Sequence, residues 1–397
     1  MDDSTGALRL RAWVEDVRRL PKDAPQRTIV QRLVYPGVSP VEGRGLLTAH
    51  AHHPVHHPGE GAQWSSLVHF MQAGDGSETN GDPEANERDA MLGSLLTLAA
   101  DRRCQLIPEL SARVQGAANA FMIPMNLRTD DTLTAPMPSW SAVDKQLADA
   151  VARLVTMPEK DASAIMAAIH MHYSSALLFT RDITGAYALA VGGVETLAAR
   201  YGKTSTNWED WDRAGSWEKF FKKNSLSEEQ AQALRDRLLS ENHIRLTERF
   251  VSYVCENLPG NFWAEKVRAY VWGIDSSSGE PIQGDWHDNG PRSQQFAEEP
   301  TALRAAVRAS YQRRSRFVHA GERSAGFVEE LFGIGPGNVR DSLSYAQLRA
   351  GLRRLILTEL SKRGDPKFPD RKKFVVDVQG ASQPHARGAS FFRERAS

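Results

Sequence analysis

The chain has little cysteine, no net charge and no long apolar run, and each absence excludes a class of protein. Only Cys104 and Cys255 are present among 397 residues. Their positions match neither a zinc-ligand nor a redox spacing, so we expect a reducing cytoplasm. The 49 basic residues balance the 49 acidic residues, so any nucleic-acid contact must come from local basic patches rather than from overall charge. The most apolar stretch, near 185–199, is short and contains Glu195, and the acidic start precedes no apolar run, so we expect neither a membrane span nor a signal peptide.

Several common catalytic motifs are also missing from the sequence. It contains no phosphate-binding loop, no Gly-x-Ser-x-Gly elbow and no His-Glu-x-x-His pair. These absences leave the usual ATPase, esterase and metalloprotease interpretations without support. At 397 residues, two to three domains are expected of a soluble protein with 41% hydrophobic and 25% charged residues.

Residues 1–138 differ in pattern from the rest and predict a small α+β region. Short β-like runs alternate with Pro, Gly and Asp, and one helix is expected at Ala85–Arg103. The segment Arg128–Pro138 has linker chemistry and is the best boundary. The predicted strands are Arg27–Tyr35, Gly45–His50, Trp64–Gln72 and Ala118–Leu127.

Helical periodicity dominates residues 139–361 and predicts an all-α bundle. Ser227 is expected to cap a long helix toward Leu258, and Thr301 to cap a further helix, with a polar loop at Asp275–Glu299 between them. Residues 362–397 carry excess basic charge and little periodicity, so we expect a partly disordered tail. Predicted helices are Ser139–Leu154, Asp161–Phe179, Asp182–Tyr201 and Leu343–Leu360, with buried faces formed by Ile165, Ile169, Tyr173, Ala176 and Phe179, and by Tyr345, Leu348, Leu352, Leu355 and Leu360.

The most informative segment is Tyr311–Gly321, YQRRSRFVHAG, which places a fixed cation and a titratable imidazole five residues apart. Arg314 offers a planar fork of donors to phosphate oxygens, and His319 can move a proton near neutral pH. The bare spacing is weak, because roughly one such pair is expected by chance in a chain of this composition. The longer string of Tyr, Arg-Ser, Val-His and Gly is much less likely to arise by accident.

This string resembles the signature of the HEPN superfamily, in particular its Apea-like branch. The resemblance covers about residues 160–361 and extends to Ala186–Leu197, similar to a small-residue helix with an embedded Glu, and to Leu343–Leu360, similar to a closing helix. It implies an all-helical, metal-independent endoribonuclease that needs no cofactor, cuts RNA such as tRNA, and acts in phage defence or as a toxin-like effector. The implied partners are a second copy of the chain and a regulatory protein or phage trigger.

Carried over by residue, the resemblance assigns the catalytic pair to Arg314 and His319 and the acidic position to Glu195. Tyr311 and Ser315 are supporting residues, although many members have a more polar residue than Ser315 after the Arg. Since Glu195 is expected to be half-buried, it needs a cationic partner, and Arg314 is the candidate. The arginines expected to contact RNA are Arg308, Arg313 and Arg316.

Helix geometry limits what one copy of this segment can do. Residues five apart on a regular α-helix point about 140° apart. Arg314 and His319 could converge if the helix distorts or ends near His319, which Gly321 permits, or if a second copy faces the first. The family uses the second arrangement, with both signatures lining one cleft.

Other interpretations of these residues remain open. Arg314 and His319 could be structural, Glu195 could be a solvated carboxylate, and the bundle could be a non-catalytic module that binds RNA, nucleotide or a protein. The aromatic residues Trp208, Trp211, Trp217 and Phe220 could stack on bases or pin a loop to the core. A histidine-rich run invites a metal site, but its prolines and missing carboxylates favour a solvated loop; the run comprises His50, His52, His53, His56 and His57.

Overall fold

The protein is described by a computed structural model and is mostly helical. The run Ala118–Leu127, the proposed linker Arg128–Pro138 and residues 367–397 lie outside the described residues. The described residues are 4–19, 27–35, 48–57, 61–73, 83–101, 104–108, 140–179, 182–204, 207–209, 211, 213–240, 245–274, 281–321 and 342–366.

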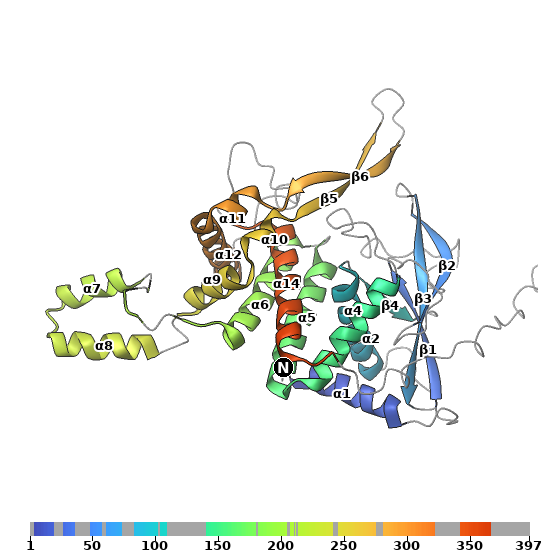
Figure 1. The fold of residues 1–397 in the computed structure, drawn as a ribbon, viewed down its shortest axis with the longest axis horizontal. Coiled ribbons are helices and arrows are strands. Elements are labelled where there is room, and N and C mark those ends of the chain that lie inside the picture. The colour runs from blue at the N-terminus through green and yellow to red at the C-terminus, as the bar shows by residue number, and fades with distance from the viewer. Residues whose placement is uncertain are drawn as a thin grey trace, which may run out of the picture.

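The helices and strands follow one another along the chain as Figure 1 labels them. The first part contains α1 (Ser4–Arg19), β1 (Arg27–Tyr35), β2 (Thr48–His57), β3 (Gly61–Ala73), α2 (Pro83–Ala100) and β4 (Gln105–Pro108). The second part contains α4 (Trp140–Thr156), α5 (Glu159–Leu178), α6 (Ile183–Tyr201), α7 (Ala214–Lys223), α8 (Glu228–Ser240), α9 (Leu246–Asn257), α10 (Gly260–Ala264), β5 (Lys266–Ile274), β6 (Pro281–Pro291), α11 (Gln294–Glu298), α12 (Pro300–Ala320) and α14 (Tyr345–Arg363).

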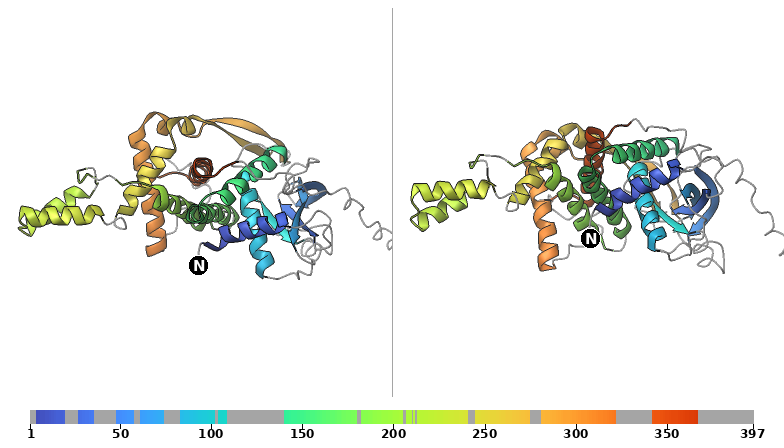
Figure 2. Two further views of the ribbon diagram at one scale, coloured as in Figure 1. Left: turned by 60° about the horizontal axis from the view of Figure 1, so that its bottom comes forward. Right: turned by 90° about the horizontal axis from the view of Figure 1, so that it is seen from below.

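The antiparallel pair α5 and α6 forms the centre of the helical bundle. Helix α14 packs across both, α9 and α12 lie on α6, and α1, α2 and α4 lie on the α5 side (Figures 1 and 2). The apolar faces expected for α5 and α14 are buried, with Ile165, Ile169 and Leu352 fully enclosed. One continuous hydrophobic core therefore includes Leu10 of α1 and Leu95 of α2 together with the bundle.

The N-terminal strands pair in the antiparallel order β2-β3-β1-β4. The histidine-rich run lies in β2, so the prediction of a loop for its backbone is wrong. The run can pair because β2 is an edge strand, where a proline costs no ladder hydrogen bond, and its register shifts between Ala51 and Pro54. The histidine side chains lie outside what the structure describes.

Three further predictions about the second part are corrected. The long helix expected from Ser227 is two helices, because α8 projects from the bundle while α9 packs within it (Figure 1). The loop expected at 275–299 contains β6 and α11, since β6 pairs with the alternating sequence of β5. Helix α12 begins at Pro300 rather than after Thr301, which suits a residue that fixes its φ angle and has no N–H to satisfy. Within the described residues, no helix combines the length and apolarity that crossing a membrane requires.

Candidate functional site

The candidate site lies on the C-terminal half of α12. This helix stays regular through Arg314 and His319 and ends one residue after His319, at Ala320. Gly321 then adopts the left-handed conformation, with φ 68°, and its N–H donates to the Phe317 carbonyl at 3.0 Å. A residue with a Cβ would be strained at this φ, so glycine suits the helix end.

The sequence of α12 explains which way Arg314 points. Leu303, Val307 and Ser310 are buried, and Arg314 continues the same helical row at steps of three and four residues. The row runs along the face that packs on α6 and α9. Arg314 therefore leaves α12 at the border of the packed face, where the side chain is 26% exposed.

A hydrogen-bond clamp fixes this part of α12 against α6 and α14. The Ser310 hydroxyl accepts a bond from the Leu343 N–H at 3.0 Å, and the Tyr187 hydroxyl donates to the Leu343 carbonyl at 3.1 Å. The backbone N–H and carbonyl of Leu343, two residues before α14, thus both have hydrogen-bond partners in the interior. The clamp sets the position of α12 one turn before Arg314.

Glu195 of α6 joins Arg314 and Tyr311 into one cluster. The Arg314 Nη2 atom lies 3.3 Å from Oε2 of Glu195, and the Tyr311 hydroxyl donates to Oε1 at 3.1 Å. The Glu195 side chain is 22% exposed, so the expectation of a half-buried carboxylate with Arg314 as its partner is met in this geometry. Burial, followed by the charge of Glu195 and the hydrogen bond to it, raises the pKa of Tyr311 to about 12. The phenol therefore remains a donor at every physiological pH.

His319 lies away from this cluster. Its side chain is exposed in the last turn of α12, whereas Arg314 sits at the packed border. Since the helix remains regular, their side chains leave it in directions about 140° apart. The helix is not distorted between the two residues; it ends at Ala320, as the expected role of Gly321 permits, but only after His319.

The remaining signature residues are spread around the helix. Arg313 stacks on the Tyr187 ring, with its guanidinium carbon 4.6 Å from the ring centre. Arg308 and Ser315 are half-buried, and Arg316 is exposed. Arg313 and Arg316 lie one helical turn apart, and of the three arginines predicted to bind RNA only Arg316 is exposed.

Two features near the site were not anticipated from the sequence. Phe250 of α9 packs against Tyr311, with ring centres 5.1 Å apart, and so helps to orient the phenol. The only available signal was the apolar periodicity of α9, which does not name a partner. The second feature is that Trp208 and Trp211 form a small aromatic core with Phe221 of α7.

The chain was compared with family models, curated proteins and solved structures, and none of the three comparisons finds a match. The function must therefore be argued from the site itself.

Proposed function

We propose that the protein is a metal-independent endoribonuclease of HEPN type that cleaves RNA by attack of a 2′-hydroxyl on the adjacent phosphate. The observation that carries this proposal is the Arg314–Glu195–Tyr311 cluster, beside an exposed histidine on the same helix. Glu195 holds the guanidinium in one orientation at a partly exposed border, where it can meet a ligand. A half-exposed ion pair contributes only about 0–1 kcal/mol to folding, so orientation is the larger benefit of this contact.

The residues divide the chemistry as follows. His319 takes the proton of the 2′-hydroxyl, and the imidazolium so formed gives a proton to the leaving 5′-oxygen. Arg314 stabilises the negative charge that builds on the phosphate oxygens. A guanidinium has five N–H donors, so contact with Glu195 leaves donors for phosphate. Bond formation at the 2′-oxygen and loss of the 5′-oxygen give a 2′,3′-cyclic phosphate and a 5′-hydroxyl.

The active form in this proposal is a symmetric homodimer. One regular α12 cannot direct Arg314 and His319 at the same phosphate, but Arg314 of one copy can face His319 of another across a two-fold axis. The two incomplete halves then form one composite cleft. The RNA, which includes tRNA as a candidate substrate, lies between the two signature helices.

The biological role belongs to the same proposal. Residues 1–138 act as an α+β sensing or regulatory domain, and residues 139–361 as the HEPN-like effector domain. The protein works in the cytoplasm as a toxin-like or phage-defence effector, released by a regulatory partner or a phage trigger. Because α1 and α2 contact α5 and share its hydrophobic core, a change in residues 1–138 would act directly on the packing of the effector domain.

The test is incubation of purified protein with total RNA or tRNA in excess chelator. Wild type should produce fragments that end in 2′,3′-cyclic phosphate, while His319→Ala and the Arg314/His319 double variant should produce none. Gln312→Ala changes an exposed residue of the same helix and should cleave like wild type. Equal cleavage by wild type and His319→Ala would remove His319 from the mechanism.

A non-catalytic module that binds RNA, nucleotide or a protein partner is the second candidate. It is favoured by the ion pair of Arg314 with Glu195, a carboxylate that also accepts from Tyr311, because this pair suffices to explain the arginine structurally. Binding of RNA without cleavage by the wild-type dimer would select this candidate.

A further inference from the structure

Helices α7 and α8 form a pair that projects away from the bundle (Figures 1 and 2). The pair has its own core, in which the Trp208 ring stacks on Phe221 at 6.0 Å and meets Trp211 edge-on at 5.3 Å. Trp211 is buried, and the guanidinium carbon of Arg245 lies 5.8 Å from its ring centre at the start of α9. The pair is thus a folded projection with an anchor at the bundle.

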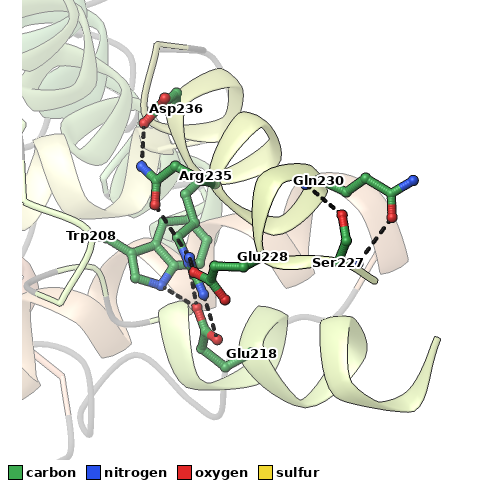
Figure 3. Close-up of polar contacts among 8 residues, drawn as sticks. Trp208, Glu218, Ser227, Glu228, Gln230, Arg235 and Asp236 are labelled. Carbon is green, nitrogen blue, oxygen red and sulfur yellow. Dashed lines mark hydrogen bonds and ion pairs between the residues drawn. The ribbon is translucent and has the colours of Figure 1, made fainter. Parts of the chain in front are cut away.

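A polar network holds the two helices together, as Figure 3 shows. Arg235 of α8 donates to both carboxylate oxygens of Glu218 of α7, at 2.8 and 3.1 Å, and to Glu228 at 2.7 Å. The indole N–H of Trp208 also donates to Glu218 at 2.8 Å. Hydrogen bonding to Arg235 lowers the pKa of Glu218, and this ion pair neutralises the only carboxylate of α7.

The outer face of α7 is aromatic and basic. Phe220 is 48% exposed, which is unusual for a large apolar side chain in a folded helix. Its ring meets the half-buried Trp217 edge-on at 5.6 Å. Lys219 and Lys223 are exposed. Lys223 is about one helical turn from Phe220 and from Lys219, so it neighbours both on the helix surface. We call these four residues the α7 face.

We propose that the α7 face binds single-stranded RNA. This proposal rests on the proposed function and names where the substrate strand is held outside the cleft. An exposed ring can stack on an unpaired base of any identity, and flanking lysines attract the phosphates on either side. Since the whole chain carries no net charge, a local group of lysines without an opposing free carboxylate on its helix is the kind of patch that RNA binding requires.

The occupant is a single strand rather than a duplex or an apolar protein surface. Bases in a duplex are stacked inside the helix and cannot reach Phe220. A protein docking surface is typically depleted of lysine at its centre, whereas the α7 face contains two exposed lysines, Lys219 and Lys223. The pair also projects on the side of the bundle where α9 and α12 lie, in every view (Figures 1 and 2). A strand held on α7 therefore lies on the side of the bundle that carries the candidate site.

The experiment measures binding separately from cleavage. A short labelled single strand of 2′-O-methyl RNA has no free 2′-hydroxyl, so it can be bound but not cut by the proposed chemistry. Fluorescence anisotropy is recorded with wild type, Phe220→Ala and the double variant Lys219→Ala/Lys223→Ala. The matched controls are Leu234→Ala, an exposed apolar residue of α8, and Lys160→Ala, an exposed lysine of α5.

Phe220→Ala should weaken binding roughly tenfold, the usual effect of removing one base-stacking ring. The lysine double variant should weaken it too and should flatten the dependence of log K on log salt by about 1.4, since each phosphate contact with a single strand contributes about 0.7. Both controls should bind like wild type, and duplex RNA should compete poorly. Thermal unfolding checks that Phe220→Ala and the double variant remain folded.

The outcomes separate this inference from the proposed function. If Phe220→Ala and the lysine variant bind the strand as tightly as wild type, the inference is overturned, including when wild type cleaves natural RNA. If binding is lost in these variants but wild type never cleaves natural RNA, the inference stands and the nuclease proposal fails. Tight binding of duplex RNA with no preference for single strands would also overturn it, because stacking on Phe220 would then have no role.

Discussion

At the scale of single residues, the contact with Glu195 fixes the orientation in which Arg314 can meet a phosphate. Arg314→Lys keeps the charge but loses the planar fork that can meet Glu195 and phosphate at once. We expect a loss of cleavage of about a hundredfold or more, the magnitude typical of a lost transition-state donor. The measurement is the cleavage rate of tRNA in chelator, with Gln312→Ala as the control for changes on the same helix. Near-full activity would mean that Arg314 supplies only bulk positive charge.

The pairing of Glu195 with Arg314 was predictable, whereas the surroundings of His172 were not. A carboxylate on an otherwise apolar helical stripe needs a cation, and the signature supplied one. His172 is fully buried in α5, and neither ring nitrogen has a hydrogen-bond partner among the described residues. Sequence periodicity places His172 on a buried face but cannot reveal a missing partner, because partners come from other elements.

His172 should make the fold sensitive to acid. Burial, and then the charges of Arg349 and Arg353 on α14, hold the pKa of His172 well below its ordinary value of 6.5. Above pH 6.5 the imidazole is mostly neutral in both the folded and the unfolded state. Below pH 6.5 the unfolded chain binds a proton at His172 and the folded chain does not, so the free energy of unfolding falls. We expect a loss approaching about 1 kcal/mol per pH unit between pH 6 and 5.

Urea unfolding of wild type and His172→Leu across this pH range measures the effect. The variant should lose stability less steeply than wild type as pH falls. His170→Leu changes an exposed histidine of the same helix and should keep the wild-type slope. Identical slopes for wild type and His172→Leu would show that His172 does not titrate differently in the two states.

At the scale of elements, the sequence predicted helices well where one apolar face is long and continuous. The buried faces of α5 and α14 follow from spacing alone, and Asp182 caps α6 by accepting the Gly185 N–H at 3.0 Å. The end of α8 and the β5–β6 pair were missed because both depend on contacts between segments. Helix α1 was missed although Ala7, Leu10 and Val14 are buried at helical spacing, so its signal was present in the sequence.

The small residues of α6 show that contacts between helices, and not the pattern of one helix alone, decide what packs on a helix face. Small residues on one face of a helix could admit a second chain at close range, yet Ala190 and Gly193 are both buried inside this one. A Cβ on Gly193 would lie 2.7 Å from Cδ2 of Leu352. These small residues therefore let α14, not a partner, approach α6.

Gly193→Ala should destabilise the bundle by about 1–3 kcal/mol, because the added methyl overpacks the contact with Leu352. Gly192→Ala is the matched control at the next position, where the new Cβ would meet Met171 Sδ at an ordinary 3.4 Å. Its helix propensity should make it neutral or stabilising by up to about 1 kcal/mol. Urea titration of both variants measures their free energies of unfolding. Equal values for both variants would contradict the close approach of α14 at Gly193.

At the scale of the whole molecule, the buried core does not stop at the proposed boundary near residue 138. Leu10 and Leu95 belong to the same core as Ile165 and Leu352. A composition shift predicts where linker chemistry occurs, but it cannot show whether the parts on either side bury their apolar faces against each other. That property depends on the arrangement of α1 and α2 on α5, which no local pattern encodes.

The last prediction concerns the assembly that cleaves RNA. Arg314 and His319 point apart on a regular helix. A single copy therefore presents only one of the two side chains to any one phosphate. The dimer contact cannot use the buried residues of α6. It is expected instead at the last turn of α12, where Val318 is 49% exposed next to His319. Val318→Glu should then weaken both association and cleavage, because a buried carboxylate without a partner is costly.

Two measurements test the composite cleft. Mixing the inactive Arg314→Ala and His319→Ala proteins should restore part of the activity, since a mixed dimer keeps one cleft with both groups intact. Light scattering together with cleavage assays over a dilution series gives the stricter result: specific activity should fall as the dimer dissociates, and should fall at higher concentration for Val318→Glu. A protein that stays strictly monomeric and cleaves RNA at full specific activity after dilution is incompatible with the composite cleft. In that case a single α12 would have to reach one phosphate with Arg314 and His319 from opposite sides, which requires the helix to unwind when RNA binds.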